Sequence, residues 1–280
     1  MKLGVVDVGG GMRGVFASGV LDYCLEAGIK FDCCVGVSAG SANLITYLAG
    51  QKERNFTFYH EYAFRQKYMS LSNFIFKGSY FDLNYIYGTL GNSDGENPLD
   101  YEAYENNPAD FFVVAEDAVS GAPVYFTRSH IKKDDCRVLM ASSSIPGINK
   151  PFDIGGKLYF DGALADPVPI QKAFLEGCDR VVLLLSKPMD EPLDYQTDVF
   201  LSNLISGQFP VSANKLMLRA EKYDRSIALA NQYASMNRLL FIAPNETFGV
   251  TATKKTKVGI EKLYAHGKEE GKKISAWLKN

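Results

Sequence analysis

The stretch DCCVGVSAGSANLITYLAG (residues 32–50) decides the fold class, because it reads as a strand, a tight turn and a helix in immediate succession. DCCVGV (32–37) is a short apolar run of the kind that forms a buried strand, and SANLITYLAG (41–50) is typical of a helix. Between them stands GVSAG (36–40), which places Ser38 at the turn. The five-letter pattern is weak by itself, since a serine at such a turn also serves as a simple helix N-cap.

A second unit of the same kind precedes this stretch. LGVVDV (3–8) predicts a buried strand, and VFASGVLDYCLEAG (15–28) predicts a helix that ends at Gly28. Strand, helix, strand and helix therefore alternate, which is typical of a parallel α/β sheet. Further strands are predicted at 111–117, 123–126, 157–160, 180–186 and 239–244, and long helices at 210–237 and 254–278.

The bulk composition excludes several classes of protein. The chain has 280 residues, 46% hydrophobic and 22% charged, with a net charge of -2, as expected for a soluble globular protein. Without a basic field, nucleic acid is not an expected partner. Asp7 interrupts the first apolar run, so no signal peptide is predicted, and no stretch approaches the length of a membrane span. A cytoplasmic protein is therefore expected.

The cysteine pattern argues against a metal centre. The count is odd and no C-x-x-C spacing occurs, so reduced buried thiols are expected rather than a zinc site. The five residues are Cys24, Cys33, Cys34, Cys136 and Cys178.

The glycine loop GGGMRG (9–14) allows two interpretations. Gly9, Gly11 and Gly14 satisfy G-x-G-x-x-G between a strand and a helix, which is the setting of a dinucleotide site. Such a site also expects an acidic residue at the end of the second strand, where this chain has the GVSAG turn instead. In the other interpretation, the N–H groups of successive glycines converge on a negative charge such as an oxyanion.

Ser38 has the context that a nucleophile needs. A strand leads into the turn and a helix leads out, as in a nucleophile elbow, and Gly36 and Gly40 remove side chains where the turn is crowded. The N–H of Ala39 follows the nucleophile and is positioned to donate to an oxyanion. The candidate bases are few. His60, His130 and His266 lie in aromatic-rich or polar stretches, whereas Asp161 follows a short strand in YFDGALADPVP (159–169), where a simple Asp-Gly turn is the alternative.

Three motifs in this order resemble those of the patatin-like phospholipases. GGGMRG (9–14) is similar to the glycine-rich loop of that family, GVSAG (36–40) to its G-x-S-x-G turn, and DGA (161–163) to its Asp-Gly-Gly/Ala motif. ASSSIP (141–146) is similar to its block of small residues and serines before a proline. The resemblance covers about residues 3–186, and it departs at Ala163, where many relatives have glycine.

The resemblance implies a three-layer α/β/α fold with a mostly parallel central sheet. It further implies one domain over residues 1–280, with the motifs in a core at 3–186 and extra helices at about 195–280. The implied activity is hydrolysis of lipid acyl esters, with Ser38 as nucleophile and Asp161 as base, and without cofactor or metal. The implied oxyanion donors are the N–H groups of Gly9, Gly10, Gly11 and Met12, in addition to that of Ala39. A relative that binds lipids without turning them over is the alternative.

Three further features remain open between two roles each. Arg13 is either a solvated surface residue or a partner for an acid or an anionic substrate group such as phosphate. The stretch 254–273, with seven lysines against three glutamates, is either a solvated helix face or a site of transient contact with an anionic membrane. The segment 56–88 holds twelve of the 35 aromatic residues, and predicts either core-packing helices or an apolar cover over the site.

Overall fold

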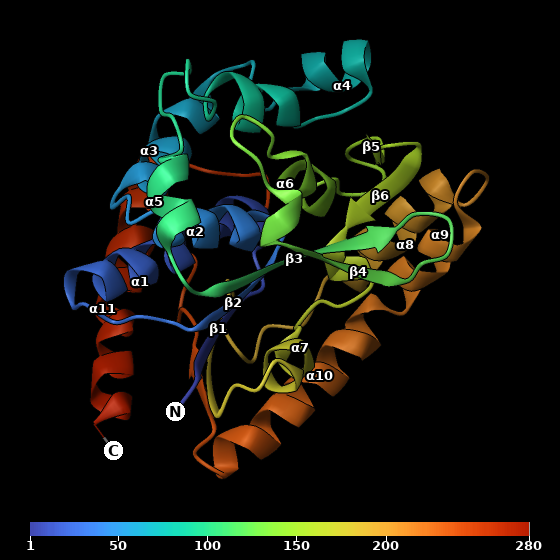
Figure 1. Ribbon diagram of the computed structural model, residues 1–280. Helices are drawn as coiled ribbons and strands as arrows, with labels where there is room; N and C mark the ends of the chain where they lie inside the picture. Colours follow the sequence, from blue (N-terminus) through green and yellow to red (C-terminus); the bar gives the residue numbers. More distant parts are fainter. Residues whose placement is uncertain (280) are drawn as a thin grey trace.

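The computed structural model describes residues 1–279 and contains one eight-stranded sheet with helices on both faces (Figure 1). The strand order is β5-β6-β3-β2-β1-β7-β8, with β4 also beside β3. The strands are β1 (Leu3–Asp7), β2 (Cys33–Val37), β3 (Asp110–Asp117), β4 (Pro123–Thr127), β5 (Phe152–Ile154), β6 (Lys157–Asp161), β7 (Arg180–Leu184) and β8 (Leu239–Ile242). The predicted α/β fold class is confirmed.

The pairing of β3 brings the ends of two distant strands together. The strands β3, β2, β1, β7 and β8 run parallel, whereas β4, β5 and β6 are antiparallel to their neighbours. One edge of β3 pairs with β4. The other edge pairs with β2 up to Val114 and then with β6 from Ala115 onward, where Asp161 is the partner. The carboxyl ends of β2 and β6 therefore meet at one point of the sheet.

Two helical layers cover the sheet because successive side chains of a strand point to opposite faces. Val5 and Cys34 pack with α1, α2, α6 and α11, while Val6 and Val35 pack with α7 and α10. The helices are α1 (Val15–Glu26), α2 (Ala39–Leu48), α3 (Arg54–His60), α4 (Leu71–Lys77), α5 (Tyr101–Asn106), α6 (Arg137–Ser142), α7 (Ile170–Leu175), α8 (Tyr195–Ile205), α9 (Pro210–Met217), α10 (Arg219–Ser235) and α11 (Lys257–Leu278). Within residues 1–279, no helix has the length and hydropathy needed to cross a bilayer.

The structure refines two expectations about helices. The helix predicted at 210–237 is divided at Leu218, because α9 packs against α8 while α10 turns away to pack along β8. In the aromatic segment 56–88, only one of the two short helices packs into the core, since α3 buries Phe58 and Tyr59 whereas α4 buries Asn73 alone. The segment contains α3, a 3₁₀ turn η2 (Tyr62–Phe64), α4 and a π-helical turn η3 (Asn84–Thr89), which wrap over one end of the sheet.

Candidate active site

Ser38 occupies the sharp turn between β2 and α2. Its backbone has φ 54° and ψ −130°, a conformation that residues with a side chain rarely adopt unless the surroundings impose it. The turn is crowded on both sides: a Cβ on Gly36 would lie 2.5 Å from the Cα of Ser41, and one on Gly40 would lie 2.3 Å from the carbonyl oxygen of Asp7. The strand–turn–helix setting predicted for Ser38 is therefore present, and its two glycines are required by close approach.

The serine block ASSSIP (141–146) forms hydrogen bonds with the backbone of both Ser38 and Asp161. The hydroxyl of Ser142 accepts a hydrogen bond from the N–H of Ser38 at 2.8 Å, and the carbonyl of Ser144 accepts one from the N–H of Asp161 at 2.9 Å. Both serines are fully buried. The sequence singled out this block by resemblance alone, without indicating that it would bridge Ser38 and Asp161.

Asp161 ends β6 and lies beside Ser38. Its carboxylate is almost fully buried, and Oδ1 accepts a hydrogen bond from the N–H of Ala163 at 2.9 Å. Burial raises the pKa of Asp161 to about 6, while hydrogen bonds from the Ser38 hydroxyl and the Ala163 N–H, and the charge of Arg219, act in the opposite direction. A carboxylate in this state is a stronger base than a solvated one, and it is in contact with a hydroxyl.

The glycine loop lies directly against the Ser38 turn. Gly9, Gly10 and Gly11 have φ values of 69°, 124° and 60°, all in the region that favours glycine. A Cβ on Gly9 would lie 2.3 Å from the carbonyl oxygen of Val37. Three successive residues in these conformations turn their N–H groups away from the regular directions of a strand or helix, and so can form an anion-binding nest.

The five predicted oxyanion donors fall into two groups. The N–H of Gly9 donates to Oδ1 of Asp7 at 2.9 Å, and the N–H of Met12 donates to the carbonyl of Ala252 at 3.0 Å. These two groups are already engaged. Across residues 1–279 no hydrogen-bond acceptor meets the other three N–H groups, which belong to Gly10, Gly11 and Ala39.

A buried polar network fixes the glycine loop to α2. Asp7 accepts from the Nδ2 of Asn43 at 3.0 Å, and Asn43 accepts in turn from the hydroxyl of Tyr59 at 3.1 Å. Burial raises the pKa of Asp7 to about 6. Asn43 also donates to the carbonyl of Gly14 at 3.0 Å. The sequence indicated Asp7 only as an interruption of an apolar run, because a hydrogen bond between the end of a strand and a distant helix leaves no signal in local spacing.

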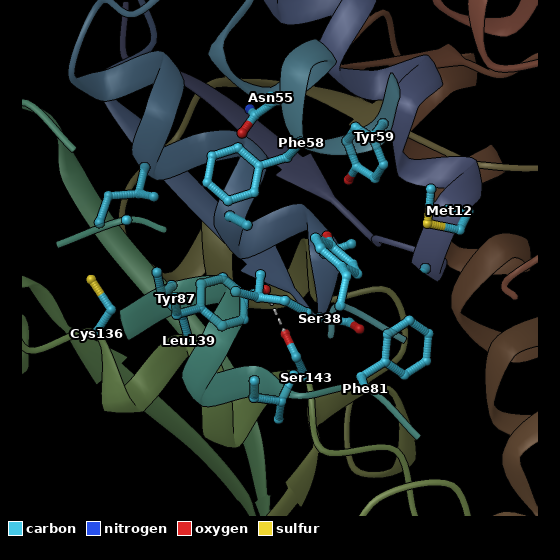
Figure 2. A pocket seen from close by; sticks show the side chains of 18 of the residues that line it. Met12, Ser38, Asn55, Phe58, Tyr59, Phe81, Tyr87, Cys136, Leu139 and Ser143 are labelled. Carbon is cyan, nitrogen blue, oxygen red and sulfur yellow. Dashed lines mark hydrogen bonds between the residues drawn. The ribbon is translucent and has the colours of Figure 1, made fainter. Parts of the chain in front are cut away.

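Ser38 lies between two cavities of different chemistry. The first, of about 90 Å³, is walled mainly by apolar side chains, among which Phe58, Tyr59, Phe81 and Tyr87 surround the hollow in Figure 2. All four come from the aromatic segment 56–88. This segment therefore does both things that the sequence left open, since the same rings belong to the hydrophobic core or pack against it and also line the cavity.

The second cavity is a cleft of about 580 Å³ that also contains Gly10 and Asp161. It is lined by both apolar and charged side chains, and we call it the polar cleft for its charged groups. Its charged lining consists of four basic side chains, Arg13, Lys187, Arg219 and Lys254, and four acidic ones, Asp161, Glu191, Asp194 and Asp198. Arg219 is paired with the buried Asp198 through two hydrogen bonds of 3.0 and 2.7 Å. Arg13 is held less tightly: Glu191 is 3.9 Å from its nearest nitrogen, and its buried Nε has no hydrogen-bond partner in the described chain. Burial lowers the pKa of Arg13 and of Lys187.

None of the three histidines lines either cavity. His60 lies between Glu61 and Glu261, at 2.5 and 2.7 Å. His130 accepts from the N–H of Thr127 at 3.1 Å, and His266 accepts from the N–H of Asn245 at 3.2 Å. Over residues 1–279, no group of three or more His, Cys, Asp or Glu side chains is placed to hold a metal ion.

Comparisons with known proteins identify relatives of the chain. The sequence model of a family described as Patatin-like phospholipase matches residues 8–174. The uncharacterized protein YjjU of Escherichia coli (strain K12) is 27% identical over 192 residues, which cover 67% of this chain and 52% of the relative. An uncharacterized NTE family protein of Mycobacterium tuberculosis (strain H37Rv) is 27% identical over 178 residues, covering 60% of this chain and 27% of the relative.

Among solved structures, the crystal structure of VipD from Legionella pneumophila aligns with a TM-score of 0.49 and 14% identity, covering 98% of this chain and 66% of that chain. The chain spans about half the length of the first curated relative that it matches.

Proposed function

Because the chain belongs to the patatin-like phospholipase family, we propose that it is a serine hydrolase that cleaves acyl esters of lipids. The observation that carries the proposal is the contact between Ser38, at its strained turn, and the buried carboxylate of Asp161, at the point where the apolar cavity meets a cleft with charged side chains of both signs. Phospholipids and lysophospholipids are the favoured substrates, because they combine an acyl chain with an anionic head group.

In the proposed reaction, the Ser38 oxygen attacks the ester carbonyl carbon while its proton passes to Asp161. A solvated aspartate, with a pKa near 3.9, is too weak a base to remove this proton beforehand, so transfer accompanies C–O bond formation. The raised pKa of Asp161, about 6, makes the carboxylate a stronger base and so makes this proton transfer less unfavourable. The protonated Asp161 then donates to the leaving alkoxide, which departs and leaves Ser38 acylated.

The second half of the cycle repeats these steps with water. Asp161 accepts a proton from the water that attacks the acyl group, and it returns the proton to Ser38 as the fatty acid leaves. The negative charge on the carbonyl oxygen is bound in both halves by the N–H groups that have no partner, those of Gly10, Gly11 and Ala39. Each well-placed donor of this kind stabilises the transition state by about 3–4 kcal/mol.

The two cavities suit the two ends of such a substrate. The acyl chain would enter the aromatic-walled cavity, where burial of each methylene contributes about 0.8 kcal/mol. The head group would occupy the polar cleft, where the guanidinium of Arg13 has only Glu191, at 3.9 Å, as an ion-pair partner within residues 1–279 and could bind a phosphate oxygen. A dinucleotide is disfavoured as the ligand, because Ser38 stands where its ribose requires an acidic side chain.

Labelling with a fluorophosphonate probe, followed by peptide mapping, tests the proposal. The probe phosphonylates an activated serine, so we expect modification of Ser38 and none in the Ser38→Ala variant. Ser186 is the matched control, since it lines the same cleft and is equally buried. Ser186→Ala should still be labelled at Ser38. A correctly folded protein that is labelled elsewhere, or not at all, would contradict a catalytic role and favour a relative that only binds lipids.

A further inference from the structure

The helix α4 presents its apolar side chains to solvent. Leu71, Phe74, Ile75 and Phe76 are 66%, 41%, 66% and 84% exposed, and together they form what we call the α4 patch. A surface helix of a soluble protein normally turns such side chains toward the core. In α4 only Asn73 is buried. Figure 1 shows α4 at one extremity of the molecule, away from the sheet and at the opposite end from α7.

The α4 patch is held in place by its two stems. Ser70 donates its N–H to the carbonyl of Tyr80, and Met69 pairs with Phe81. The amide of Asn73 donates to the carbonyl oxygens of residues 66 and 67 at 3.3 and 3.1 Å. The same stems carry Tyr68 and Phe81 into the wall of the apolar cavity beside Ser38. The α4 patch and this part of the wall of the apolar cavity therefore belong to one continuous segment of the chain.

Three lysines lie beside the two stems of the α4 patch. Lys67 precedes the helix, the side chain of Lys150 lies against Gly78 at its end, and Lys255 contacts the sulfur of Met69 at 2.9 Å. In the described part of the chain, none of these three lysines forms an ion pair with an acidic side chain. The paired lysines nearby are Lys77, with Asp82, and Lys257, with Glu61.

We propose that the α4 patch docks the protein on an anionic phospholipid bilayer. Apolar side chains that enter the acyl region, with cations beside them at the level of the head groups, are the combination that binds such a surface. A second copy of the chain fits less well, because it would bring the two sets of unpaired lysines together. The inference rests on the proposed function in one respect: a docked bilayer would supply acyl chains to the cavity at the stems of α4.

Vesicle sedimentation tests the docking independently of hydrolysis. The parent protein carries Ser38→Ala so that the lipid stays intact, and the vesicles are equimolar phosphatidylcholine and phosphatidylglycerol. We expect the parent to sediment with these vesicles and the triple variant Leu71→Ser/Ile75→Ser/Phe76→Ser to bind at least about tenfold more weakly. Leu175→Ser is the matched control, because Leu175 on α7 is 83% exposed and should bind as the parent does.

The charge contribution is tested on the same vesicles. Lys67→Glu/Lys150→Glu should weaken binding, and the effect should shrink at high salt. Lys30→Glu/Lys279→Glu, which changes two exposed and unpaired lysines elsewhere, should not. With Ser38 restored, the triple variant should keep the parent's melting temperature and its turnover of a soluble short-chain ester.

Three results would overturn the docking proposal: no sedimentation of the parent, equal binding of the triple variant, or a parent dimer that the triple variant abolishes. The proposed catalytic function is judged separately, since its failure appears as absent turnover of the soluble ester.

Discussion

The two cavities that meet at Ser38 come from different parts of the chain. Every residue that lines the apolar cavity lies between Gly11 and Ile145, within the segment that the family model matches. The polar cleft is walled largely by residues 186–254, which lie beyond that match. The proposed acyl cavity is therefore built wholly from the matched segment, while the proposed head-group cleft combines Arg13 of that segment with residues of the C-terminal part.

The two walls also differ in how tightly they specify a ligand. An apolar wall stabilises a chain in proportion to the area that it buries, so it discriminates mainly by length and volume. A partly buried cation such as Arg13 instead requires an oppositely charged group in reach. A change in the apolar wall should therefore alter selectivity for acyl-chain length alone. A change in the polar wall should alter selectivity for head-group charge alone.

The largest effect is expected at Ser38 and Asp161, where the two cavities meet and the proposed reaction takes place. Asp161→Asn should lower kcat by about 10³-fold or more for every ester, because the amide cannot accept the Ser38 proton. In the parent, kcat/KM should rise with pH to a plateau above about 6, as Asp161 loses its proton. The measurement is the pH profile of ester hydrolysis.

Asp166→Asn is the matched control for this change, since Asp166 lies in the same loop but accepts its hydrogen bond from Tyr125 at 2.6 Å. It should retain most activity, as should each single His→Asn variant. A histidine variant that folds correctly but does not turn over would refute the role of Asp161 as sole base.

The Asp161→Asn substitution should also stabilise the protein at neutral pH. The raised pKa means that folded Asp161 binds its proton more tightly than the unfolded chain does, so stability falls as pH rises from about 4 to about 6. Asp161→Asn removes this loss, and the free energy of unfolding at pH 8 should increase by about 1–3 kcal/mol. Below pH 4 the gain should vanish, which denaturant titration at both pH values can check.

A change in the apolar wall should alter chain-length preference alone. Ala42, on α2, lines the apolar cavity, and Ala42→Leu would fill part of it. We expect kcat/KM for long-chain esters to fall about 10–100-fold relative to short-chain esters. Ala42→Ser, which adds a single oxygen at the same position, should shift this ratio much less. An equal loss for all chain lengths would argue that the chain binds elsewhere.

A change in the polar wall should have the smallest effect, and it should depend on head-group charge. Arg13→Ala should lower kcat/KM about tenfold for anionic phospholipids relative to neutral esters, and Arg13→Lys should recover part of the loss. Folding should be little affected, because Glu191 is half-exposed and 3.9 Å away. Arg219 is a poorer probe, since its removal would leave the buried Asp198 without a partner. Equal losses on neutral and anionic esters would count against a head-group role.

The strand–turn–helix units at the N-terminus could be predicted because they depend on neighbours along the chain. Apolar runs of strand length, helical spacing and glycines at tight turns are local signals, and β1, β2, α1 and α2 formed as expected. The strand β5 was missed because three residues are too few to show a period. The break at Leu218 was missed because helical spacing continues across it, while the two halves pack on different neighbours.

Sequence by itself determined the residue types that the proposed chemistry needs and their order: a glycine loop, Ser38 and Asp161. Only the tertiary structure decided which of them touch, because contact depends on the register of β3, whose one edge passes from β2 to β6 between Val114 and Ala115. It also decided that the N–H groups of Gly9 and Met12 donate hydrogen bonds to Asp7 and Ala252. The outward orientation of the apolar side chains of α4 was likewise decided by the tertiary structure. Such facts arise from pairing across long chain separations, which local spacing does not encode.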